Sequence, residues 1–290
     1  MDSLKRKNYP LYFLLPGLVI FMVFFIVPFF VAIYYSFTNW DFVNANFVGI
    51  RNYKNIIMDP EMNIAFKNTF AFAIVTSVGK LVLGMILAVF LNRKFRLTNY
   101  LRTVYFLPFA LNLIAVGVAF KAIMHPEKGI LNVVLQGGGV DFLAQNWLTD
   151  PKIALLSVCA IDIWKGTGYI MLILLAGMQN TSKDYYEAAE IDGATGWQEF
   201  WKITFPLIRP SFNNALLLNV ITGLKVFDMI ISTTNGGPGV TTQVFNTVIY
   251  RSYSLNRQGE ACAGTIVLAA IVFVITMITY GIVAKKEVEL

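Results

Sequence analysis

The chain has 290 residues, of which 57% are hydrophobic and 14% charged, and its formal net charge is +6. A soluble domain of this length could not bury that much apolar surface, so the composition predicts a membrane protein. The basic residues are spread over several segments. This spread argues against a nucleic-acid site and favours an anionic lipid surface as the partner of the positive charge.

Six apolar stretches are each long enough to cross a bilayer core of ~30 Å as a helix. They are Leu11–Phe37, Asn68–Leu91, Val104–Ile123, Ile153–Gly177, Phe205–Ser232 and Ala261–Ala284. The first is about twice as long as the apolar part of a typical signal peptide, so we expect it to be a retained span. The sequence thus predicts an all-α membrane protein, with one membrane domain at residues 11–284 between an N-terminal arm at 1–10 and a tail at 285–290.

Positive charge sets the expected orientation. The short segments on the side of the N-terminus carry more Lys and Arg than the longer segments on the other side. The positive-inside rule therefore predicts that both termini are cytoplasmic. The outside loops contain turn-forming runs at 136–139 and 235–239 and are too short for a separate domain.

One cytoplasmic connection, residues 179–206, is the longest inside segment and is acidic. Its sequence predicts two short helices. Gly193 supplies a left-handed stop for the first, and Thr195 with Gln198 forms a capping box that starts the second. Ala188 and Ala189 form a small-residue patch on the first helix, which another protein could approach closely. We interpret this connection as a docking element.

The same connection carries a known pattern. Glu187-Ala188-Ala189, then Gly193, then Ile203-Thr204-Phe205-Pro206 resembles the EAA signature of ABC importer permeases, with Phe205 where the signature has Leu. Other stretches resemble the carbohydrate branch of that family (maltose, glycerol-phosphate and multiple-sugar permeases), in particular the first member of a two-permease pair. They are residues 47–53, 68–70, 129–132 and 146–148, Trp164 with Gly168, Phe227 with Asp228, and the turn at 236–238.

The resemblance implies the type I importer permease fold, with six transmembrane helices and a coupling helix parallel to the membrane that docks in a cleft of a cytoplasmic ATPase. The residues implied in this ATPase coupling are Tyr186, Glu187, Ala188, Ala189, Asp192, Gly193, Ala194, Ile203 and Pro206. The implied partners are a second homologous permease, two ATPases that bind ATP and Mg, and an extracellular or periplasmic solute-binding protein. The implied location is a bacterial or archaeal cell membrane.

The implied cargo is a sugar, with an oligosaccharide expected first and a phosphorylated polyol second. The sequence has no G-x-x-x-x-G-K-[ST] loop, so we expect ATP to bind to a separate subunit and expect no cofactor or metal in this chain.

Several charged and aromatic residues fall inside the predicted spans. An ionisable group at the centre of a membrane helix costs at least ~2.5–3.5 kcal/mol, so it needs a partner or a wet cavity. Asp162 with Lys165, and Lys225 with Asp228, are spaced to share a helix face and form ion pairs. The candidate substrate path is Asp162, Trp164, Lys165, Asn219, Lys225, Phe227 and Asp228. Pairs that fasten helices together are an equally good interpretation.

Lys80 has no acidic neighbour in its own predicted helix, so we hypothesise that it meets Asp162 or Asp228 across the bundle.

Two other classes of protein stay open. An ion-driven secondary transporter could use Lys80, Asp162 or Asp228 as a relay, although the acidic docking connection argues against it. A membrane-embedded enzyme would need convergent catalytic groups, and the sequence offers one histidine, His125, and two cysteines. We interpret Cys159 and Cys262 as small packing residues.

Overall fold

The computed structural model describes residues 11–93 and 96–284, and helices form nearly all the regular structure of these residues. One isolated antiparallel bridge joins Thr38 and Phe47. The predicted N-terminal arm at 1–10 and the tail at 285–290 lie outside the described residues. The chain divides into two compact units, Met1–Met58 with Ile249–Val267 and Asp59–Val248 with Leu268–Leu290.

The first unit contains the first predicted span. Its elements are η1 (Leu11–Leu14), α1 (Leu15–Phe21), η2 (Met22–Ile26), α2 (Val27–Ser36), α3 (Arg51–Met58), most of α14 (Phe245–Ser254) and the start of α15 (Gln258–Ala284). A continuous helical run at Tyr12–Ser36 is long and apolar enough to cross a membrane. This confirms the expectation of a span there.

A buried amide fastens the end of this span. The Asn52 side chain donates to the carbonyl oxygens of Ser36 and Thr38 at 2.8 and 2.7 Å, where α2 ends and leaves carbonyls without helical partners. The hydroxyls of Ser36 and Tyr53 are 2.6 Å apart. Asn52 and Tyr53 belong to the stretch at 47–53 quoted above, and in the structure they join α2 to α3.

The second unit contains the remaining elements. They are α4 (Pro60–Asn92), α5 (Thr98–Ala110), α6 (Leu113–Ile123), α7 (Ile130–Gly137), η3 (Asp141–Leu143), α8 (Ala154–Gln179), α9 (Asp184–Ile191), α10 (Gly196–Glu199), η4 (Phe200–Thr204), α11 (Phe205–Leu207), α12 (Arg209–Leu224) and α13 (Asp228–Thr233), followed by the first residues of α14 and the second part of α15.

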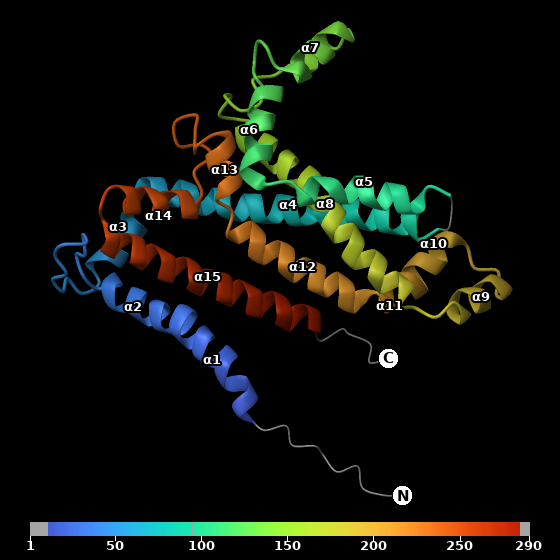
Figure 1. Ribbon diagram of the computed structural model, residues 1–290. Helices are drawn as coiled ribbons and strands as arrows, with labels where there is room; N and C mark the ends of the chain where they lie inside the picture. Colours follow the sequence, from blue (N-terminus) through green and yellow to red (C-terminus); the bar gives the residue numbers. More distant parts are fainter. Residues whose placement is uncertain (1–10, 94–95, 285–290) are drawn as a thin grey trace, which may run out of the picture. The chain divides into compact units, whose positions relative to one another are not determined.

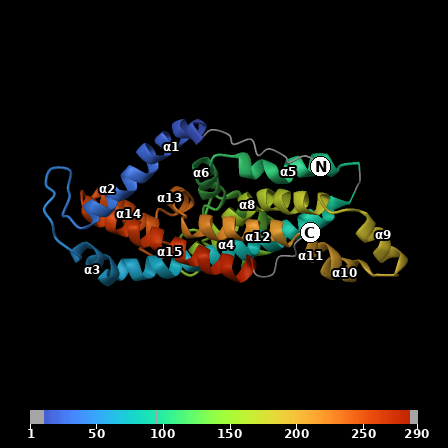
Figure 2. The ribbon, with the colours of Figure 1, turned by 90° about the horizontal axis from the view of Figure 1, so that it is seen from below.

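Three long helices, α4, α8 and α12, lie side by side and form the core of this unit (Figure 2). Glycines allow the close approach: a side chain at Gly84 would press on Ile170 of α8, and one at Gly223 would press on the backbone of Ala73. Lipid supplies little hydrophobic drive between helices, so membrane helices associate largely through close van der Waals packing, which small residues at the interface permit.

Three further predicted spans are confirmed as continuous helices: Pro60–Asn92, Ala154–Gln179 and Gln258–Val283 are each long and apolar enough to cross a membrane. Helix α4 begins at Pro60 and not at Asn68. The cause is a cap, since the Asp59 carboxylate accepts hydrogen bonds from the backbone N–H groups of Glu61 and Met62.

The third and fifth predicted spans are not straight helices. Helices α5 and α6 meet at 94°, and Figure 1 shows α6 leaving α5 at this steep angle. Helix α12 ends at Leu224 and α13 starts at Asp228. Within the described residues, four continuous helices and one bent pair could cross a membrane, which is compatible with six spans without confirming the count.

Gly168 offers a direct test of helix packing. A Cβ atom there would lie 1.9 Å from the Tyr105 carbonyl oxygen, which is backbone and cannot swing away. We expect Gly168→Ala to force α5 off α8 and to destabilise the chain by about 1–3 kcal/mol, seen as a lower midpoint of thermal unfolding in detergent. Gly281→Ala, where a Cβ meets no atom within 4 Å, is the control. Equal midpoints for the two variants would contradict this packing.

Candidate functional site

The connection between α8 and α12 has the local structure that its sequence predicts. Helix α9 spans Asp184–Ile191, and Gly193 has a φ of +73°, the left-handed conformation that favours glycine. Thr195 and Gln198 form the reciprocal capping box that starts α10. The chain then passes through η4 and α11 into α12, so the element leads directly into a core helix.

Helix α9 has one exposed face and one face that is buried against the rest of the chain. Glu187 and Ala188 are exposed, and Ile191 is 86% exposed, which is unusual for an apolar side chain. Ala189 is buried, and the buried hydroxyl of Tyr186 has no hydrogen-bond partner among the described residues. The exposed face therefore combines carboxylates with small and apolar side chains, which is suited to contact with another protein.

The other predicted coupling residues lie along the same connection. Asp192 and Gly193 are exposed, and Ala194 is half-buried. Ile203, in η4, and Pro206, in α11, are also half-buried. They occupy the part of the connection that leads into α12.

An aromatic ladder follows α9, and the sequence reasoning missed it. Ring centroids are 5.6 Å apart for Trp197 and Trp201, 5.4 Å for Trp201 and Phe205, and 5.4 Å for Phe205 and Phe212. The four-residue spacing of the first three, one helical turn, is the signal that could have found it. Residues of the ladder line a cavity of about 680 Å³ together with apolar residues of α4.

An ion pair lies inside the helix core. Lys80 Nζ of α4 is 2.5 Å from a carboxylate oxygen of Asp162 on α8, and both side chains are largely buried. Gly166 makes room for it, because a Cβ there would press on the Lys80 stem. The hypothesis that Lys80 meets Asp162 across the bundle is confirmed.

Lys165 does not form the predicted pair with Asp162. Asp162 is bound to Lys80, while Lys165 Nζ donates to the carbonyl oxygen of Phe109 at 2.9 Å and lies 5.1 Å from the Phe109 ring centroid. The prediction was wrong because this acceptor, a carbonyl at the end of α5, exists only where the third span bends.

The predicted pair of Lys225 and Asp228 is also wrong in its geometry. Lys225 directly follows the end of α12 and Asp228 is the first residue of α13, so the break between the helices removes the shared helix face that their spacing implied. Both side chains are exposed. The Asn246 amide donates to the Lys225 carbonyl oxygen at 2.9 Å, and half-buried Phe227 directly precedes α13.

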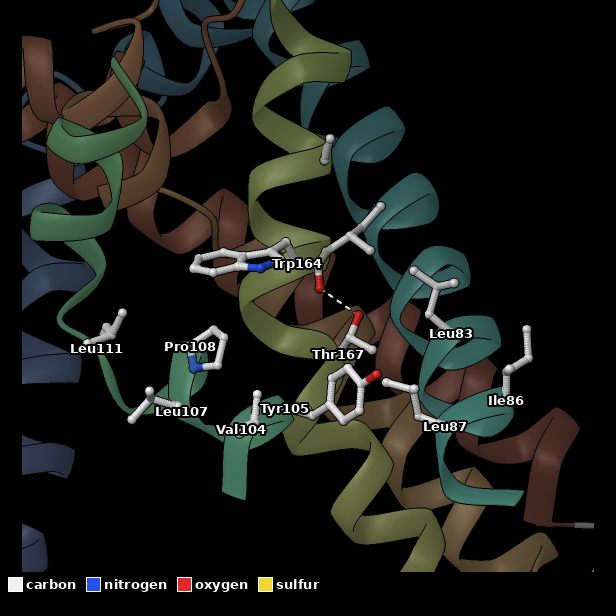
Figure 3. Close-up of a pocket in the computed structure, with 13 residues that line it drawn as sticks. Leu83, Ile86, Leu87, Val104, Tyr105, Leu107, Pro108, Leu111, Trp164 and Thr167 are labelled. Atoms are coloured by element: carbon white, nitrogen blue, oxygen red, sulfur yellow. Dashed lines mark hydrogen bonds between the residues drawn. The ribbon is translucent and has the colours of Figure 1, made fainter. Parts of the chain in front are cut away.

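Trp164 and Asn219 face different surroundings. Trp164 lines an open, mostly apolar hollow of about 790 Å³ between α4, α5 and α8 (Figure 3). The hydroxyl of Thr167 in this hollow already donates to the Ile163 carbonyl oxygen at 2.6 Å. Asn219 is buried, and its Nδ2 atom has no hydrogen-bond partner among the described residues. The assignment of these residues to a substrate path stays a prediction.

His125 and the two cysteines take part in local structure and packing. His125 Nδ1 accepts hydrogen bonds from the N–H groups of Glu127 and Lys128 and so closes a turn. Cys159 is buried in the apolar core, as expected for a packing residue, and Cys262 is half-buried in α15.

Residues 80–286 match the family model of the binding-protein-dependent transport system inner membrane component, which covers well over half of the chain. The chain belongs to this family. It is 35% identical to a probable ABC transporter permease protein of Pyrococcus horikoshii, with 92% of this chain and 93% of the relative covered. It is 32% identical to the trehalose/maltose transport system permease protein MalF of Thermococcus litoralis, with 96% and 95% covered.

A solved structure has the same fold. A chain of a bacterial ABC transporter involved in the import of the acidic polysaccharide alginate superposes with a TM-score of 0.84, at 24% identity, with 94% of each chain covered. The all-α importer permease fold expected from the sequence is therefore confirmed, and the chain is a membrane component of a binding-protein-dependent transport system.

Proposed function

We propose that this chain is one of two permease subunits in an ATP-driven importer of carbohydrates, and that it forms half of the translocation path. Family membership supports the importer class. The cargo is proposed from the trehalose/maltose and alginate systems to which the chain is similar. An oligosaccharide is the first candidate, and a phosphorylated polyol is the second.

The observation that carries the proposal is the geometry of the connection at 179–206. Its exposed helix α9 is followed by the left-handed Gly193, a capping box and an aromatic ladder, so the connection has defined local structure from α9 to α12. A force applied to α9 by an ATPase would pass through η4 and α11 into α12, which packs against α4 and α8.

The residues have distinct roles in this proposal. Glu187, Ala188 and Asp192 contact the ATPase, and Gly193 makes the sharp turn that α9 needs to lie across the cleft. Ile203 and Pro206, both half-buried, anchor the connection at the start of α12.

The proposed assembly adds three kinds of partner to this chain: a second homologous permease, two cytoplasmic ATPases and an external solute-binding protein. ATP and Mg are bound by the ATPases, and this chain acts without catalysis of its own. Both termini are cytoplasmic in this proposal, because the coupling connection then lies on the same side as the ATPases, in agreement with the distribution of Lys and Arg.

An experiment that identifies the energy source of uptake tests the proposal. Uptake of labelled maltodextrins and of glycerol phosphate is measured in cells that express the full system, either with an uncoupler or after ATP depletion. We expect oligosaccharide uptake to persist with the uncoupler and to stop without ATP. Uptake that stops with the uncoupler while ATP is maintained would favour the ion-driven transporter, and uptake of glycerol phosphate alone would favour the phosphorylated polyol.

A further inference from the structure

The bend in the third span releases backbone groups. In a continuous helix the Phe109 carbonyl oxygen would accept a hydrogen bond from the N–H of residue 113, but the 94° turn between α5 and α6 removes that partner. Non-helical backbone at membrane depth is tolerated only where protein or water satisfies the freed groups. The break therefore needs side chains that satisfy these freed backbone groups.

Side chains cap both new helix ends. At the start of α6, the Asn112 Oδ1 atom accepts from the N–H groups of Ile114 and Ala115 at 3.0 and 3.2 Å. At the end of α5, Lys165 Nζ donates to the Phe109 carbonyl oxygen at 2.9 Å, and Lys165 is only 7% exposed. A cation at the negative end of a helix is favourable in addition to the hydrogen bond.

The last turn of α5 is held firmly on α8 around this contact. The Phe109 ring stacks on Tyr169 of α8, with centroids 4.4 Å apart and planes within 8°. Gly168 lets the Tyr105 backbone approach α8 closely. The Lys165 ammonium is therefore the polar member of a contact that fixes where α5 stops.

The packing of α6, which follows the break, depends on where α5 ends. Phe120 of α6 packs edge-on against Trp164 of α8, with centroids 5.1 Å apart. Gly117 of α6 lies directly against Ser232 of α13. The direction in which α6 leaves the break thus decides how α6 meets both Trp164 and α13.

We propose that Lys165 is a positioning residue. It satisfies the carbonyl that the bend releases and so fixes the direction of α6. Its consequence for transport rests on the proposed function, since α6 would carry Phe120 to its place against Trp164 of α8, beside the translocation path. Its structural effect does not depend on any transport activity.

Spin labels on either side of the break test this directly. The full-length chain, with Cys159→Ala and Cys262→Ala, is labelled at Tyr100→Cys on α5 and Val118→Cys on α6, two positions that are exposed in this chain. The distance distribution is measured by pulsed electron paramagnetic resonance in lipid nanodiscs. A second pair, Val78→Cys and Ile86→Cys, lies within the single helix α4 and reports on the integrity of the fold.

We expect one narrow distance for the 100–118 pair, at least a twofold broadening in Lys165→Met, and a return to a narrow distance in Lys165→Arg, which keeps a charged donor. The 78–86 distance is expected to stay unchanged in both variants. An unchanged 100–118 distance in Lys165→Met would overturn the proposal. Broadening of both pairs would overturn it too, because Lys165 would then support the fold in general and not the bend.

Discussion

Replacing Lys80 with Met is expected to destabilise the chain by about 3–5 kcal/mol, because it leaves the Asp162 carboxylate buried without its cation. The cost comes from the uncompensated charge more than from the lost attraction. The free energy of unfolding is measured on purified protein in mixed micelles with increasing denaturing detergent, and Trp fluorescence serves as the signal.

The double variant separates these two costs. Lys80→Met with Asp162→Leu removes both charges, so we expect stability within about 1 kcal/mol of the wild type or above it. Lys67→Met, on the exposed surface of the same helix, is the control and should change little. A double variant as unstable as the single one would contradict a pair that fastens α4 to α8. Loss of transport in a double variant of wild-type stability would assign the pair to the substrate path.

Replacing Gly193 with Ala is expected to reduce ATP hydrolysis stimulated by the loaded binding protein by roughly tenfold in the reconstituted system. Gly193 has a φ of +73°, which costs a residue with a Cβ atom about 1–2 kcal/mol. Relief of that strain would turn α9 away from the ATPase cleft. A Cβ at this position meets no atom of the chain within 4 Å, so crowding within the chain cannot cause the loss.

Gly196 is the matched control for this test. It lies three residues further on, a Cβ there also meets no atom within 4 Å, and its φ is not positive. Gly196→Ala should therefore keep the stimulated rate. Equal losses in the two variants, or no loss in Gly193→Ala, would argue against a turn at Gly193 that sets the coupling geometry.

Local signals in the sequence were enough to predict the continuous spans and the coupling connection. Hydropathy over about 20 residues identifies a membrane helix without knowledge of its neighbours, as for Tyr12–Ser36. The capping box of Thr195 and Gln198 and the stop at Gly193 are likewise local, and both are present in the structure. These features depend on backbone chemistry within a few residues.

The breaks in the third and fifth spans could not be derived in the same way. Pro108 near the end of α5 and Asn112 at the start of α6 were available as signals, but an apolar stretch that contains them still has the hydropathy of a straight span. The partner of Lys165 was unpredictable for a further reason: it is a main-chain carbonyl, which leaves no trace in the pattern of side chains. Contacts created by a bend are known only once the bend is known.

If this chain works in an importer beside a second permease and separate ATPases, those subunits should remain bound to it during purification from native membranes. The tagged wild-type chain is isolated under mild detergent, and the co-purifying subunits are identified by mass. We predict an ATPase with a phosphate-binding loop and a second permease homologous to this chain. A chain that emerges alone and still transports its cargo after reconstitution would contradict the account and would favour an ion-driven transporter.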